Sequence, residues 1–270
     1  MQCRKRIFHY IKGDFKMKRI VSTIAISMTL SMSAAGAAFA TPSTQIWIPS
    51  TDVQAYKTLH LGIDNYLRTE RRDDNSRDPN VYDLGLTAGV LPFEKVQMEV
   101  GIDYLVNGTD YDNYPVYFNA KLGTPEESLF KYSPALAVGG YNFGTNSSSG
   151  SAFRTDQNIV YALAAKTLPV IGRFSAGYFV GNDKVLLDEN GKKENDGVLL
   201  SWDRTMSEIS DKLWMAVDYQ GGDSAMGALS FGVAWAFSKN VSVILGYDVY
   251  NNDKVAGKNT FTTQLDINFP

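Results

Sequence analysis

The chain has 270 residues, with 26 Lys and Arg against 29 Asp and Glu, and one cysteine, Cys3. Seven of the basic residues and one acid precede Thr41, so the remainder carries 19 basic and 28 acidic residues, a net charge of −9. Such an acidic product argues against nucleic-acid binding, which needs clustered Lys and Arg. A lone cysteine at position 3 argues against a disulfide framework and against cysteine-based metal or nucleophile sites.

The N-terminal 40 residues have the pattern of an export signal. Met17-Lys18-Arg19 gives a positive start, residues 20–37 are apolar, and Ala38-Phe39-Ala40 is a small-x-small cleavage site. An uncleaved anchor is the alternative, because residues 20–40 could span a bilayer, but the cleavage pattern favours removal. We therefore predict an upstream extension plus signal peptide over residues 1–40, with cleavage after Ala40. Translation could start at Met1 or at Met17, and the sequence leaves both open.

Residues 41–54 form a lead-in that we expect to be periplasmic or to enter a lumen, and residues 55–270 are predicted to be all β. After Ala40 no apolar run approaches the length of a membrane helix, whereas short alternating segments recur. Twelve strands are predicted, at 55–67, 82–90, 95–105, 114–123, 134–143, 158–167, 172–181, 197–204, 212–219, 226–237, 241–250 and 260–269.

The connections between these strands alternate in length and composition. One set is shorter (91–94, 124–133, 168–171, 205–211 and 238–240). The other is rich in Asn, Asp, Gly, Ser and Lys (68–81, 106–113, 144–157, 182–196, 220–225 and 251–259). Membrane barrels have short turns on the periplasmic side, long loops outside and an even number of strands. The alternation therefore favours such a barrel.

Within the strands, apolar and polar residues occupy opposite faces, as in Phe261, Thr263 and Leu265 against Thr262 and Gln264. A soluble β-sandwich has the same period. Two features favour the membrane barrel. Aromatic residues fall at both expected headgroup levels, with Tyr82, Tyr104, Tyr161, Tyr178, Tyr219 and Phe261 near the loops and Phe174, Trp202, Trp235, Phe237 and Phe269 near the turns. The last strand also ends on an aromatic residue.

Together, the leader, the twelve strands and the terminal Phe269 resemble the bacterial outer-membrane β-barrel proteins of the porin-like, twelve-stranded size class. The resemblance implies an up-and-down antiparallel transmembrane β-barrel in the outer membrane, in contact with its lipid. It also implies recognition of the C-terminal strand by the barrel assembly machinery. Pro270 departs from that pattern, because it follows the aromatic residue that normally ends the chain.

Enzymatic chemistry has little support in the sequence. His60 is the only histidine after the leader, and most hydrolytic sites need a histidine base. An outer-membrane hydrolase is therefore a third hypothesis, and His60 is expected to be a hydrogen-bonded lumen residue. Asp103, Asp110 and Asp112 lack the fixed calcium-loop spacing. No metal and no cofactor are expected.

Counting inward positions by strand parity gives eight acids and three bases that would line the lumen: Asp64, Asp83, Glu99, Asp103, Asp203, Asp218, Asp248 and Asp266, with Lys121, Lys166 and Arg173. Ion pairs across the lumen are one alternative, but five acids remain if every base is paired. A twelve-stranded barrel has an interior of intermediate width: side chains fill an eight-stranded barrel, whereas sixteen or more strands leave a wide aqueous channel. The sequence thus predicts a narrow porin-like channel for small hydrophilic solutes or cations; a non-conducting structural or surface-interaction barrel is the alternative.

Overall fold

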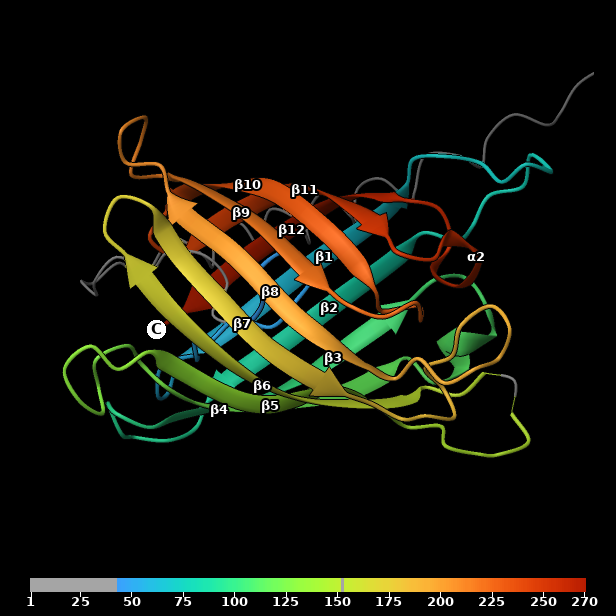
Figure 1. Ribbon diagram of the computed structural model, residues 1–270, viewed down its shortest axis with the longest axis horizontal. Helices are drawn as coiled ribbons and strands as arrows, with labels where there is room; N and C mark the ends of the chain where they lie inside the picture. The colour runs from blue at the N-terminus through green and yellow to red at the C-terminus, as the bar shows by residue number, and fades with distance from the viewer. Residues whose placement is uncertain (1–42, 152) are drawn as a thin grey trace, which may run out of the picture. The chain divides into compact units, whose positions relative to one another are not determined.

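The computed structural model describes residues 43–151 and 153–270, which form twelve antiparallel strands closed into a barrel (Figure 1). The predicted signal peptide lies outside the described residues. The strands are β1 (Leu59–Arg68), β2 (Val81–Gly89), β3 (Gln97–Val106), β4 (Val116–Thr124), β5 (Ala135–Gly144), β6 (Asp156–Leu168), β7 (Gly172–Val180), β8 (Asp196–Thr205), β9 (Leu213–Gln220), β10 (Ala228–Ser238), β11 (Val241–Tyr250) and β12 (Thr260–Phe269). Two short helices, η1 (Asp110–Asn113) and α2 (Asp253–Ala256), lie in loops.

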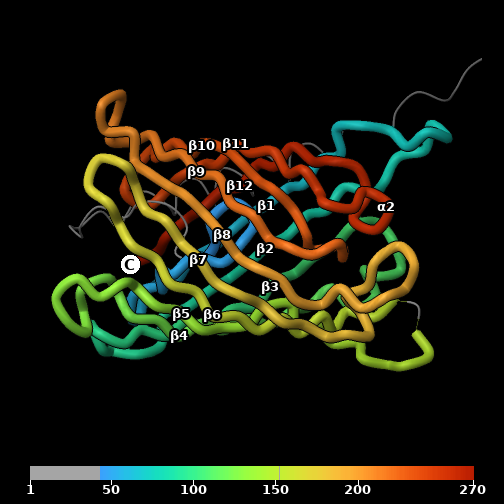
Figure 2. The backbone as a smooth tube through the Cα atoms, in the orientation of Figure 1, coloured from blue at the N-terminus to red at the C-terminus, as the bar shows by residue number. Residues whose placement is uncertain are grey.

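Each strand pairs with its neighbours in the sequence, and β1 pairs with β12 to close the ring. In that closing pair Leu59 lies opposite Phe269 and Arg68 opposite Thr260. An even number of strands brings the start of β1 and the end of β12 to the same end of the barrel, which Figure 2 shows as the end near the label C. The up-and-down twelve-stranded barrel predicted from the sequence is confirmed.

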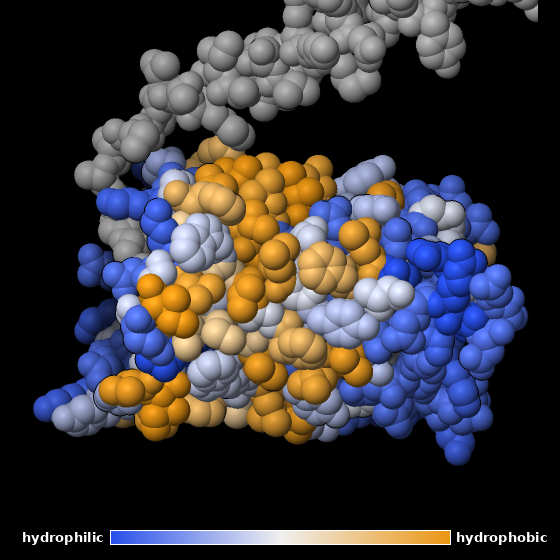
Figure 3. Space-filling view, turned by 90° about the horizontal axis from the view of Figure 1, so that it is seen from above, coloured by the Kyte–Doolittle hydropathy of each residue, from blue (hydrophilic) through white to orange (hydrophobic). Residues whose placement is uncertain are grey.

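The two ends of the barrel differ in their connections. The turn end carries residues 90–96, 125–134, 169–171, 206–212 and 239–240. The loop end carries residues 69–80, 107–115, 145–151, 153–155, 181–195, 221–227 and 251–259. Figure 3 shows the hydrophilic loop end on the right and apolar side chains over the strands. Exposed apolar residues occur on many strands, as at Leu84, Ile102, Val138, Leu200 and Leu245. No helix among the described residues is long and apolar enough to cross a membrane.

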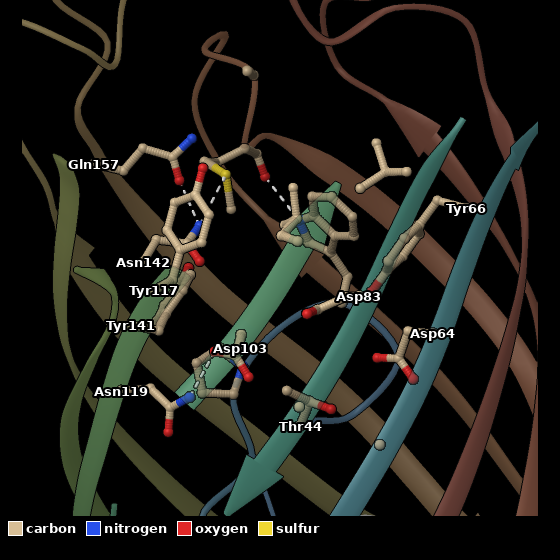
Figure 4. A pocket seen from close by; sticks show the side chains of 18 of the residues that line it. Thr44, Asp64, Tyr66, Asp83, Asp103, Tyr117, Asn119, Tyr141, Asn142 and Gln157 are labelled. Carbon is tan, nitrogen blue, oxygen red and sulfur yellow. Dashed lines mark hydrogen bonds between the residues drawn. The ribbon is translucent and has the colours of Figure 1, made fainter. Parts of the chain in front are cut away.

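The first strand begins later than predicted, because residues 55–58 still belong to the lead-in. Lys57 adopts a positive φ of 63°, which interrupts an extended chain, and β1 starts at Leu59. The lead-in from Ser43 to Thr58 does not stay outside the barrel. Its central residues Ile46 and Ile48 are buried, and Figure 4 shows Thr44 inside the barrel wall.

On β6 the predicted faces are inverted. Ile159, Tyr161, Leu163 and Ala165 are all buried and face the interior, so the prediction of Tyr161 as an outward aromatic is wrong. Lys166 lies on the other face of β6 from these four residues, so it does not line the lumen as predicted. Its Nζ forms an ion pair of 2.6 Å with Glu126 in the turn that follows β4. The physical reason is that the interior next to β6 is apolar, because Ile48 of the lead-in packs there.

Candidate functional site: a lumen crossed by an N-terminal hairpin

Residues 43–50, the lumen hairpin, fold back on themselves inside the barrel. Gln45 N–H donates to Ile48 C=O at 2.7 Å, and Ser50 N–H donates to Ser43 C=O at 3.1 Å. At the tip, the N–H groups of Ile46 and Trp47 both donate to one carboxylate oxygen of Asp218, at 2.7 and 3.1 Å. Buried backbone groups need such partners. Asp218, on β9, is therefore the anchor of the hairpin tip.

Apolar side chains pack the hairpin against two neighbouring groups of strands. Ile46 packs on Trp214, Ala216, Ala234 and Ile244 of β9–β11. Ile48 belongs to a second cluster, on β6–β8 and the loop after β7, with Ile159, Tyr161, Leu163, Phe179, Leu186 and Leu199. Burying each isoleucine contributes about 1.5–3 kcal/mol. Because β8 and β9 are neighbours, the two clusters hold the hairpin along one continuous part of the wall, from β6 to β11.

Polar contacts hold the flanks of the hairpin. Lys121 pairs with Glu99 at 3.0 Å and donates to Ser43 C=O at 3.1 Å. The second Glu99 oxygen accepts from Gln54 N–H at 2.6 Å. Glu99 and Lys121, predicted as pore-lining charges, therefore neutralise each other and also fasten the lead-in.

A second polar group lies nearer the turn end. Arg173 pairs with Asp203 at 2.9 Å and with Asp52 of the lead-in at 2.7 Å. Asp203 also accepts from the Gln45 side chain at 3.1 Å and from the Trp214 indole at 3.2 Å. Arg173 and Asp203, both predicted to line the pore, are therefore bound to each other and to Asp52 and Gln45 of the lead-in.

Predicted lumen residues line two cavities of the barrel. The larger, of about 570 Å³, extends from the hairpin residues Thr44, Ile46 and Trp47 to the loop-end residues Arg72 and Tyr111. We call it the outer cavity. The smaller, of about 380 Å³, is lined by Asp52, Arg173, Asp203 and Trp214 and by the turn after β6. Cavities of this size are typical of small-molecule sites.

The predicted lumen residues divide between these places. Six of them line the outer cavity: Asp64, Asp83, Glu99, Asp103, Lys121 and Asp266. Arg173 and Asp203 line the smaller cavity. Asp218, Asp248 and Lys166 line neither cavity: Asp218 is covered by the hairpin, Asp248 is buried and accepts from Ser230 and Thr260 at 2.7 and 2.8 Å, and Lys166 is bound to Glu126.

Asp64, Asp83 and Asp103, the acid trio, come together on neighbouring strands. Asp64 of β1 lies directly opposite Asp83 of β2. Asp103 of β3 lies opposite Gly85, and a Cβ on Gly85 would come within 2.9 Å of the Asp103 carboxylate, so Asp103 occupies the space beside Asp83. Like charges directly opposite each other destabilise a sheet. Asn119 donates to Asp103 at 2.7 Å, and no Lys or Arg among the described residues forms an ion pair with the trio.

His60 lies at the floor of the outer cavity, where its ring contacts two neighbours. Its Nδ1 is 3.1 Å from the Asn268 side-chain oxygen, and its Nε2 is 3.5 Å from Asp266. The second Asp266 oxygen accepts from Ser242 at 3.3 Å. These contacts orient the imidazole within the wall. Among the described residues, no group of three or more acidic, histidine or cysteine side chains, the acid trio included, is placed so that it could hold a metal ion.

The sequence left open whether the lead-in is periplasmic or enters the lumen, and it did not identify Gln45, Ile46, Trp47 and Ile48 as the residues that fill the lumen. A signal was present, because three consecutive apolar residues stand before the first strand in an otherwise polar segment. Nothing in the sequence specifies their receptor, since Asp218, Gln264 and Trp214 come from strands more than 160 residues away.

No protein family and no curated protein matches the sequence. Among solved structures, the fold is similar to an outer membrane channel from Pseudomonas putida F1, at 13% identity and a TM-score of 0.48, over 80% of this chain and 96% of that chain. It is also similar to the KdgM porin, at 8% identity and a TM-score of 0.47, over 78% of this chain and 98% of that chain. The NanC porin is similar at 10% identity and a TM-score of 0.44, over 78% of this chain and 99% of that chain. These likenesses are distant and concern the fold alone.

Proposed function

We propose that the protein is a narrow passive channel of the porin type, in which the lumen hairpin forms the constriction. The supporting observation is a barrel that holds a cavity on the loop side of the hairpin and another at the turn end. A barrel closed only for stability needs neither cavity, because an interior of side chains alone packs at close density. The hairpin would thus restrict passage to small hydrophilic solutes.

The proposed location is the bacterial outer membrane, reached through the predicted signal peptide. Exposed apolar residues on the strands supply a surface for lipid, and a closed barrel leaves no unpaired strand edge in the bilayer. The proposed partner during assembly is the barrel assembly machinery, through the C-terminal strand that ends at Phe269. That side chain is 37% exposed, and Phe269 pairs with Leu59 in the closing strands.

The proposed preference is for cations over anions. The acid trio has no basic ion-pair partner among the described residues, and it lines the outer cavity. Carboxylates in a confined cleft raise the local concentration of cations. Arg68 is the basic residue on the same wall, and it is held at the rim by the carbonyl groups of Pro79, Ala256 and Lys258. Its charge offsets part of the negative field.

Reconstitution of the folded protein into planar bilayers tests the channel. We expect discrete conductance steps, smaller than those of a wide porin, and swelling of liposomes in small sugars but not in large ones. Absence of steps and of swelling would overturn the proposal. A preparation of Leu245→Arg, which places a charge on a 46% exposed outer position, serves as a control for insertion, because it should insert poorly.

A non-conducting structural barrel is the second candidate, and the hairpin itself favours it, because its two isoleucines and Asp218 contacts fill the lumen between the cavities. Silent bilayers together with normally folded protein would support this candidate. A screen of lipid and peptide hydrolysis tests the third hypothesis; loss of any activity in His60→Gln would identify an enzyme.

A further inference from the structure

The outer cavity has two chemically different walls. Strands β1–β3 supply the acid trio. Strands β4–β6 supply Tyr117, Tyr141 and Tyr161, and Trp47 of the hairpin and Tyr66 also line the space. Figure 4 shows Tyr117 and Tyr141 across the cavity from Asp64 and Tyr66, with Asp83 and Asp103 between them. A solute in this cavity would therefore meet carboxylates and aromatic rings together.

The acid side of the cavity is incompletely satisfied. One oxygen of Asp83 is buried and accepts no hydrogen bond from the described residues, and Figure 4 shows this side chain directed into the cavity. Buried polar atoms normally have partners. Three of the four basic residues that line the cavity are in ion pairs: Lys121 with Glu99, Arg72 with Asp78, and Arg154 with Asp156. The fourth, Arg68, donates to backbone carbonyl groups at the rim. A cationic ligand would supply the missing partner.

The aromatic side is held rigid before any solute arrives. Trp47 contacts Tyr66 and Tyr250 edge-on, with ring centroids 5.5 Å apart in both pairs. Its indole N–H donates to Met226 C=O at 2.9 Å. Tyr141 donates to the Gln220 side chain at 3.1 Å. Fixed rings of this kind attract cations through their faces and accept apolar groups by contact.

These two walls distinguish between classes of cation. An inorganic cation would use the carboxylates but has no apolar surface to bury against the rings. A sugar would need donors and acceptors on all sides. We propose that the outer cavity binds organic ammonium ions that carry an apolar or aromatic body, with the ammonium group at the acid trio and the body against Trp47 and the tyrosines. This inference rests on the proposed channel function, since it names the solute class of the same lumen.

Calorimetric titration of the folded full chain in detergent tests the site apart from conduction. The probes are phenethylammonium, the neutral 2-phenylethanol, the anionic phenylacetate, and ethylammonium, which has the charge without the ring. Phenethylammonium should bind at least about tenfold more tightly than each of the other three, because only it satisfies both walls. Equal binding of the alcohol or the anion would overturn the role of the acids. Equal binding of ethylammonium would overturn the role of the rings.

The variant that tests the acids is Asp64→Asn/Asp83→Asn/Asp103→Asn, the triple-Asn variant. It should weaken phenethylammonium binding at least about tenfold. The matched control is Asp73→Asn/Asp183→Asn/Asp211→Asn, which removes the same charge from exposed connections and should bind as the wild type does. Asp83→Asn alone replaces the triple-Asn variant if that fails to fold, and should also weaken binding.

Unchanged binding in the acid variants, or an equal loss in the control, would overturn the inference. Conduction separates the two proposals: selective binding with silent bilayers would overturn the channel and leave the site, whereas conduction without selective binding would overturn the site alone.

Discussion

Among the described residues, inward aspartates have hydrogen-bonding or ionic partners around the hairpin but lack Lys or Arg partners in the outer cavity. Around the hairpin, Asp218 accepts two backbone N–H groups and Asp203 binds Arg173, Gln45 and Trp214. In the outer cavity, Asp64 and Asp83 face each other across a strand pair, with no basic partner among the described residues. All four aspartates occupy inward positions on their strands. The hairpin decides which carboxylates are structural and which remain available to a solute.

The difference shows what an inward carboxylate can do for a barrel. Where the lead-in covers it, the carboxylate takes the place of water and satisfies buried N–H groups. Where nothing covers it, neighbouring carboxylates repel each other, and this repulsion lowers the free energy of unfolding of the sheet. An unfavourable cluster that persists in a folded protein is a common sign of a functional site.

The largest effect is expected from removal of the hairpin. Deleting residues 43–50 behind an intact leader should raise single-channel conductance several-fold, because the segment between the two cavities is lost. The measurement is the conductance histogram in planar bilayers. An unchanged histogram in a folded variant would show that the hairpin does not limit the current.

The next comparison pairs two inward aspartates. Asp218→Ala should cost about 3 kcal/mol, because it leaves the N–H groups of Ile46 and Trp47 without their buried acceptor. Asp83→Asn should instead stabilise the barrel by about 0.2–1 kcal/mol, since it relieves repulsion from Asp64. Both are read from urea titrations of unfolding in lipid. Effects of the same sign would remove the distinction between the two parts of the lumen.

Two inward glycines give a steric form of the same comparison. At Gly246 an added Cβ would lie 2.9 Å from Thr262 Cγ2 and 3.1 Å from Ile46 Cγ2, whereas at Gly62 the nearest atom is 3.6 Å away, on His60. Gly246→Ser should therefore cost about 1–3 kcal/mol by overpacking against the hairpin, and Gly62→Ser much less. If the hairpin is deleted, we expect part of the Gly246→Ser cost to disappear in the same titration.

The smallest effect concerns the loops that surround the mouth. Asp78 accepts from Lys258 N–H at 2.9 Å and from Arg72 Nε at 2.6 Å. Burial alone would raise the pKa of Asp78, but these hydrogen bonds outweigh it and lower that pKa below its ordinary value of 3.8.

A lowered pKa means that the contribution of Asp78 is present above about pH 4 and is lost as the pH falls through the lowered value. Protease cleavage of loops 69–80 and 251–259 should therefore increase in acid. Asp78→Asn should show that cleavage already at neutral pH, with a loss of less than about 1 kcal/mol. A variant as resistant as the wild type would show that the Asp78 contacts do not hold the loops together.

Much of the barrel follows from the sequence, because alternation and connection length are local properties. On β12, Thr262 and Gln264 point inward as the period of two predicts. On β6 the same reasoning fails, since Tyr161 and Leu163 are apolar and inward against Ile48. Hydrophobicity identifies the buried face only when the polarity of the interior is known, and here that polarity changes where the lead-in enters.

The outer cavity could be predicted only in part. Parity brings Asp64, Asp83 and Asp103 to the interior, but their adjacency depends on the register between β1, β2 and β3. The hairpin contacts are less predictable still. Trp47 meets Tyr66 and Tyr250 through a turn of the lead-in, which no local pattern encodes.

The reversal potential of the wild-type channel in a KCl gradient tests the central claim most directly. Because the acid trio lines the outer cavity without basic partners among the described residues, potassium should permeate faster than chloride. The preference should weaken with salt, as the screening length falls from about 10 Å at 0.1 M to about 3 Å at 1 M. The triple-Asn variant should move the reversal potential toward zero, while the exposed triple control should leave it unchanged. Anion selectivity, or a reversal potential indifferent to the trio, would contradict a cation pathway lined by Asp64, Asp83 and Asp103.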